Sequence, residues 1–185
     1  MTRLSQLPET ELQKIVALPY KAGLWISHAD DVEGEADDLS EMKALERGIP
    51  ELASLHKNSL LVNDVASAIM ERKEQWTEWE EECFYIVKQA PEVIDFIANE
   101  FGVDEAKQYR AFTMELGKLV AQAHGEFSAF DEFKEEKESF FSSMINKIVG
   151  GISELSKDDA GHPANMSPAE NSALSQLSKA LSVKE

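Results

Sequence analysis

The sequence contains little cysteine and few basic side chains. Its one cysteine, Cys83, excludes a disulfide within the chain and a metal site built from several cysteines. Its 18 lysine and arginine residues are outnumbered by 35 aspartate and glutamate residues, so the formal net charge is −17. Because nucleic acids are bound through basic side chains that neutralise phosphates, this balance argues against a nucleic-acid partner. An anionic membrane surface would repel the chain for the same reason.

Long apolar runs are also missing. No stretch approaches the roughly 20 apolar residues that cross a bilayer. The first residues of the chain lack the apolar segment of a secretory signal. We therefore expect a cytoplasmic protein without membrane insertion.

Recognisable catalytic motifs are absent as well. The sequence has no glycine-rich phosphate loop, no nucleophile elbow and no His-x-x-x-His or Glu-x-x-His pair. Cys83 lies at helical spacing from Trp79 and Ile86, which is typical of a buried thiol. We predict that the protein is not an enzyme. An enzyme whose carboxylates and histidines meet only on folding is the less favoured alternative.

The apolar residues that are present recur at intervals of three and four, and alternating β-type runs do not occur. This spacing predicts an all-α bundle of seven or eight helices in a single domain. The core is expected over residues 1–156, and a loop with a C-terminal helix docked on it over 157–185. Pro19 is expected to break or kink the helix that precedes it, and Pro50 is expected to end its helix.

Several residues mark helix ends. Asp38 is expected to be an N-cap, and Gly102 a C-terminal glycine. Ser167-Pro168-Ala169-Glu170 has a capping serine, proline at the first helical position and glutamate at the third, which predicts a helix start. Leu174, Leu177 and Leu181 then form a narrow apolar stripe. We favour docking of this stripe on the bundle over binding of a partner.

One pattern occurs twice. Residues 24–30 form an apolar helix end that runs into an acidic loop and then an acidic amphipathic helix. Residues 119–126 have the same character and lead into the helix that begins near Phe130. A fainter third copy covers 161–170. The fold therefore contains two echoed helix–loop–helix units.

These units resemble the TerB-like tellurite-resistance family, whose members are helical bundles with an Ala-Asp-Gly-like turn before an acidic helix start. The residues that carry the likeness are Ala29-Asp30 with Glu41, then Ala123-His124-Gly125-Glu126 with Asp131 and Glu132, and more loosely Ser167–Glu170. The chain departs from the pattern at Asp31, where glycine is preferred, and at His124, where aspartate is preferred. The resemblance implies clustered acidic side chains that hold a divalent ion, and a role in metal or oxyanion stress.

The chemistry of the turns agrees with a cation site, because hard cations need several oxygen ligands at one point. The spacing is not that of an EF-hand, because Val32 and Gly34 occupy ligand positions counted from Asp30. The predicted ligands of Ca²⁺, Mg²⁺, Mn²⁺ or Zn²⁺ are Asp30, Asp31, Glu41, His124, Glu126 and Glu132. The alternative is a solvated acidic loop whose carboxylates favour the positive end of the next helix.

A second functional hypothesis needs no metal. The acidic surface would dock a basic protein partner, and the association would weaken as salt is added. Trp76 and Trp79 lie three apart on one helical face with Cys83. We expect them in the core, and an exposed binding stripe is the alternative.

Overall fold

The computed structural model describes residues 3–29, 35–123, 134–150 and 167–183 of the 185-residue chain. These residues form helices and no strand, which confirms the predicted all-α fold. Three 3₁₀-helices are short: η1 (Arg3–Gln6), η2 (Lys73–Gln75) and η3 (Cys83–Tyr85). The α-helices are α1 (Glu9–Ser27), α2 (Glu35–Leu55), α3 (Leu60–Glu71), α4 (Trp76–Glu82), α5 (Ile86–Glu100), α6 (Val103–Ala123), α7 (Lys134–Gly150) and α8 (Pro168–Ala180).

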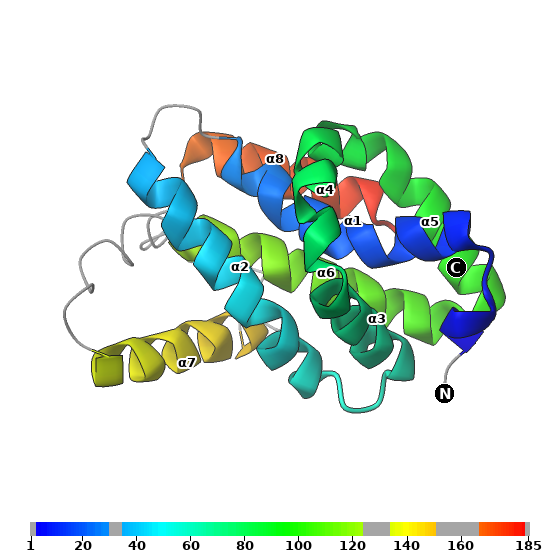
Figure 1. Ribbon diagram of the computed structural model, residues 1–185, viewed down its shortest axis with the longest axis horizontal. Coiled ribbons are helices and arrows are strands. Elements are labelled where there is room, and N and C mark those ends of the chain that lie inside the picture. The colour runs from blue at the N-terminus through cyan, green and yellow to red at the C-terminus, as the bar shows by residue number, and fades with distance from the viewer. Residues whose placement is uncertain (1–2, 30–34, 124–133, 151–166, 184–185) are drawn as a thin grey trace.

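Helices α1 and α6 pack side by side at the centre of the bundle and run in the same direction (Figure 1). Near their starts, the Tyr109 hydroxyl of α6 donates a hydrogen bond of 2.7 Å to the carbonyl oxygen of Ile15 on α1. Near their ends, a Cβ on Gly117 would lie 3.4 Å from the Cγ1 of Ile26. The first helices of the two echoed units therefore end at the same side of the molecule.

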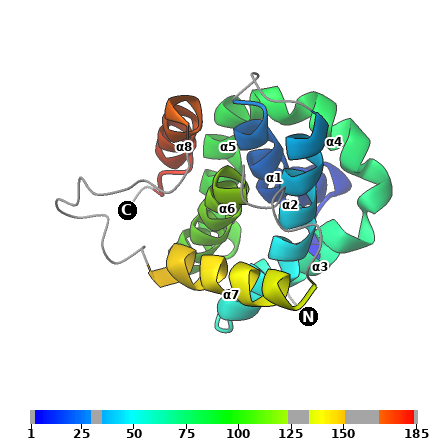
Figure 2. The same cartoon turned by 90° about the vertical axis from the view of Figure 1, so that its left-hand side faces the viewer.

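The other helices surround this pair. Helices α2, α3, α5, α7 and α8 all contact α6, and α4 lies against α1 (Figure 2). Most positions of α6 from Phe112 to Ala123 are buried, including adjacent ones, which is the pattern of a helix with neighbours on several sides. Within the described residues, no helix is long and apolar enough to cross a membrane.

The expected helix end at Pro50 is wrong, and the helix that contains Pro19 is not broken there. Pro19 lies inside α1 and Pro50 lies inside α2, and neither helix stops there. A proline in a helix interior removes one hydrogen bond and costs about 3 kcal/mol. The apolar side chains next to each proline, such as Leu18 and Ile49, are buried in the core. Their burial offsets the cost, because tertiary packing of an apolar face supplies most helix stability in proteins.

The local end signals agree better with the structure. Gly102 has a φ of 101°, a conformation in which a residue without Cβ is favoured, and α5 ends just before it. The α2 helix begins at Glu35 rather than after Asp38, so the expected N-cap at Asp38 is wrong. Acidic residues suit the first turn of a helix as well as its cap, which left the start ambiguous by a few residues.

The start of α8 is confirmed. The Ser167 hydroxyl accepts from the Glu170 amide at 3.1 Å, and the Ser167 amide donates to a Glu170 carboxylate oxygen at 2.8 Å. These two bonds form the predicted capping box. Leu177 and Leu181 are fully buried, and α8 packs against α1, α5 and α6.

Candidate functional site

The structure describes the side chain of one of the six predicted metal ligands, Glu41. The other five lie outside the described residues: Asp30, Asp31, His124, Glu126 and Glu132. Their convergence on one ion therefore stays a prediction. The structure does describe the helices that come before and after these residues in the chain: α1 and α2 for the first turn, and α6 and α7 for the second.

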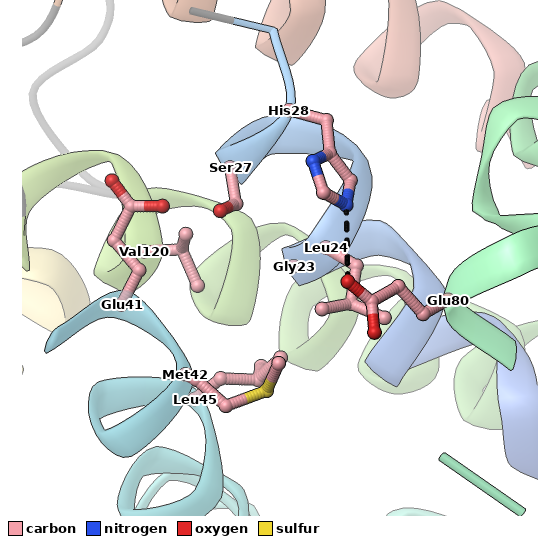
Figure 3. A pocket seen from close by; sticks show the side chains of 9 residues that line it. All are labelled: Gly23, Leu24, Ser27, His28, Glu41, Met42, Leu45, Glu80 and Val120. Atoms are coloured by element: carbon pink, nitrogen blue, oxygen red, sulfur yellow. Dashed lines mark ion pairs between the residues drawn. The ribbon is translucent and has the colours of Figure 1, made fainter. Parts of the chain in front are cut away.

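A small pocket lies where the end of α1 meets α2, α4 and α6 (Figure 3). Its hollow of about 50 Å³ has room for a few water molecules. The polar members of its wall come from different helices: Ser27 and His28 from α1, Glu41 from α2 and Glu80 from α4. The apolar members are Gly23, Leu24, Met42, Leu45 and Val120.

Glu41 is a carboxylate at a position that faces the core. The buried stripe of α2 continues from it at helical spacing through Leu45, Gly48, Ile49 and Leu52. Only 4% of Glu41 is exposed, although burial of a charged group is costly in an apolar environment. The sequence signal was this spacing: a glutamate stands in line with apolar residues three, four and seven places apart.

His28 and Glu80 form a loose ion pair across the pocket. Their closest atoms, Nε2 and Oε1, lie 3.6 Å apart, and the side chains are 31% and 43% exposed. His28 directly follows the last residue of α1, and its amide donates the final hydrogen bond of the helix, to the carbonyl oxygen of Leu24 at 2.9 Å. Its ring also stacks on Phe84, with centroids 5.5 Å apart. Neither His28 nor Glu80 was among the ligands predicted from sequence, and no sequence signal pointed to Glu80.

Contacts with α1 fix α4 in this place. The buried ammonium of Lys21 donates to a carboxylate oxygen of Glu82 at 2.5 Å. The Tyr20 ring stacks on Trp76 with centroids 4.5 Å apart and meets Trp79 edge-on at 5.8 Å. Trp79 is buried and Trp76 is partly buried, so their predicted place in the core is confirmed.

Cys83 lies just beyond α4 and is fully buried, which confirms the interpretation as a core thiol. Burial raises the pKa of its thiol to about 11, and the charge of Glu80 adds to this effect. At neutral pH the side chain is therefore a neutral thiol rather than the thiolate that acts as a nucleophile.

The pocket residues do not make a metal site by themselves. Within the described part of the chain, no group of three His, Cys, Asp or Glu side chains could hold one ion. Glu41 and the His28–Glu80 pair line the same hollow, but any ion bound there needs further ligands. The residues next in the chain after His28 and Ala29 are the predicted ligands Asp30 and Asp31.

A second histidine–glutamate pair lies at the other end of α2 and was missed from sequence. The ring nitrogens of His56 lie 2.8 Å from Gln108 Oε1 and 2.8 Å from Glu115 Oε2; Glu115 is buried, and the side chain of His56 is nearly so. Burial lowers the pKa of His56, but the hydrogen bonds to Glu115 and Gln108 outweigh it, so the net pKa is raised above 6.5. His56 is 52 and 59 positions from Gln108 and Glu115 in the sequence, and the packing of α6 on the α2–α3 connection brings them together.

Comparisons of the chain with protein-family models, with curated proteins and with solved structures gave no match. The TerB-like resemblance is therefore a hypothesis that rests on the turn sequences alone.

Proposed function

We propose that this protein is a non-enzymatic, TerB-like helical domain that binds a divalent cation at the turn between α1 and α2. The observation that carries the proposal is Glu41, a nearly buried carboxylate in the wall of a pocket at the end of α1. The stress-response role that accompanies it is proposed from the family resemblance of the turns.

The donor types around the pocket suit a cation. Glu41 and Glu80 supply carboxylate oxygens and Ser27 supplies a hydroxyl oxygen, which are ligands for Ca²⁺ or Mg²⁺. The imidazole of His28 would extend the range to Mn²⁺ or Zn²⁺. In this proposal Glu41 contacts the ion, and Asp30 and Asp31 provide the additional ligands that the described residues lack.

The electrostatics of the helix ends support the same location. The C-terminal end of a helix carries a partial negative charge of roughly half an electron. Helices α1 and α6 are parallel, so their negative ends, Ser27 and Ala123, lie at the same side of the bundle. A buried carboxylate next to these ends attracts a cation more strongly than an exposed one, because less water screens the charge.

Calorimetric titration of Ca²⁺, Mg²⁺, Mn²⁺ and Zn²⁺ at physiological salt tests the proposal. We expect saturable binding of at least one ion with a Kd below about 1 mM, the range of weak calcium modules. Glu41→Gln keeps the size of the side chain and removes its charge, and we expect it to weaken binding by at least about tenfold.

The matched control is Glu71→Gln, which removes the same charge from an exposed position at the end of α3. It should leave the affinity within about twofold of the native protein, since an exposed distant charge is largely screened. Absence of saturable binding below about 1 mM would overturn the proposal. Equal weakening by both substitutions would also overturn it, because the ion would then respond only to net charge. The double substitution Glu126→Gln, Glu132→Gln tests separately whether the second turn contributes.

A further inference from the structure

An exposed ridge on α4 and η3 combines aromatic rings with carboxylates. Phe84 and Tyr85 are each 62% exposed, among the most exposed large apolar side chains of the described residues. Glu78, Glu81 and Glu82 are exposed on the helix just before them. We call these five residues the α4–η3 ridge. The helix that carries it crosses the front of the bundle in Figure 1 and lies at the edge of the bundle in Figure 2.

The order of residues along the ridge places a carboxylate one helical turn before each ring. Glu80, which borders the ridge, precedes Phe84 by four residues, and the ridge residue Glu81 precedes Tyr85 by four. Side chains at this spacing are neighbours on a helix surface. A cation on the Tyr85 ring would therefore have the Glu81 carboxylate beside it.

Local basic side chains fill one of these two ring–carboxylate pairs, Phe84 with Glu80, and leave the other, Tyr85 with Glu81, open. Lys21 is buried and held by Glu82, and His28 faces Glu80 and stacks on Phe84. Among the described residues, Glu78 and Glu81 form no ion pair. Lys88 is exposed about one helical turn after Phe84, so a basic side chain follows the ridge in the chain.

We propose that the α4–η3 ridge is a docking surface for a basic, arginine-containing segment of a partner protein. A guanidinium group stacks on aromatic faces and forms forked hydrogen bonds with a carboxylate, so one arginine satisfies both halves of a ring–carboxylate pair. The net charge of −17 attracts basic segments to the protein at longer range. The inference does not rest on the proposed cation site, because none of the ridge contacts needs a metal.

Fluorescence anisotropy with a labelled peptide of alternating arginine and glycine tests the ridge. EDTA is present throughout, so the outcome is independent of cation binding. Salt is held near 0.15 M, where charges more than about 8 Å apart are largely screened. We expect the double substitution Phe84→Ala, Tyr85→Ala to weaken binding roughly fivefold, from the loss of the cation–π contact with Tyr85 and of the exposed surface of Phe84 beside it. A lysine–glycine peptide should bind more weakly than the arginine peptide.

Two matched controls separate the ridge from general attraction. Leu60→Ala truncates an apolar side chain that is 64% exposed on α3, and it should leave the affinity unchanged. Glu81→Gln and Glu71→Gln each remove one exposed charge, and only Glu81→Gln should weaken binding, by roughly threefold. Circular dichroism of each variant verifies that the helices are retained.

Two results would overturn the proposal. One is native affinity in a folded Phe84→Ala, Tyr85→Ala protein. The other is equal weakening by Glu81→Gln and Glu71→Gln, which would show that the peptide responds to the overall charge and not to this surface.

Discussion

Two histidine–glutamate pairs in this protein have the same chemistry and different surroundings. His56 and Glu115 lie 2.8 Å apart with side chains that are 9% and 3% exposed. His28 and Glu80 lie 3.6 Å apart and are 31% and 43% exposed. In the first pair, the other ring nitrogen of His56 is hydrogen-bonded to Gln108, so no ring nitrogen is left for a ligand. The second pair lines the pocket at the end of α1. A buried pair whose hydrogen bonds are complete stabilises the fold, whereas a loose pair beside a pocket leaves its donors within reach of a ligand.

The largest expected effect follows from removal of the buried histidine. His56→Ala leaves the Glu115 carboxylate buried without its partner, and loss of one member of a buried pair costs about 3 kcal/mol. Urea denaturation should therefore show a free energy of unfolding lower by about this amount. The matched substitution is His28→Ala, which should cost less than about 1 kcal/mol because its partner is half exposed. Equal losses in the two variants would contradict the distinction between the pairs.

A smaller effect is expected from Gly48→Ala, a substitution inside α2. A Cβ at Gly48 would lie 2.1 Å from the Cδ2 of Leu119, a fully buried side chain of α6. The buried Leu119 side chain or helix α2 must then move, and overpacking of this kind costs about 2 kcal/mol despite the better helix propensity of alanine. Because α2 carries Glu41 and leads to His56, the shift should lower both thermal stability and cation affinity. Gly150→Ala is the control, since a Cβ there meets nothing within 4 Å.

The smallest expected effect is the dependence of stability on pH. The pKa of His56 in the folded protein is raised above 6.5, so the folded state holds the proton more tightly than the unfolded chain. The stabilisation is fully present below pH 6.5 and is lost as the pH rises through the folded value. The difference in unfolding free energy between the native protein and His56→Gln should therefore decrease from acidic to mildly alkaline pH. A difference that is constant with pH would contradict a charged His56–Glu115 pair.

Much of the fold could be predicted because it depends on local patterns. Three- and four-residue apolar spacing predicted the all-α bundle, and Ser167 with Glu170 predicted the capping box that starts α8. Gly102 marked a helix end because its left-handed φ favours a residue without Cβ. The failures at Pro19 and Pro50 have the opposite origin. Proline disfavours the interior of a helix, but burial of the neighbouring apolar side chains outweighs this local preference. The free energy of that burial cannot be obtained from the spacing of apolar residues alone.

The candidate site was predicted less completely. Glu41 was singled out because it follows an acidic turn, and it lines the pocket together with His28, which was not among the predicted ligands. Glu80, the Phe84–Tyr85 surface and the His56–Glu115 pair carried no motif. Each depends on a contact between residues about 50 or more positions apart or on exposure in the folded state.

The sequence by itself determined the helical class, the acidic surface and the concentration of carboxylates at the turn after His28, because composition and short-range spacing do not depend on how helices pack. The tertiary structure decided the rest. Parallel packing of α1 and α6 placed the ends of both echoed helices on one side, and the contacts of Lys21 and Tyr20 with α4 brought Glu80 to the pocket. Those contacts depend on shape complementarity among distant side chains. For the same reason, two histidine–glutamate pairs with the same chemistry became one buried hydrogen-bonded pair and one wall of a pocket.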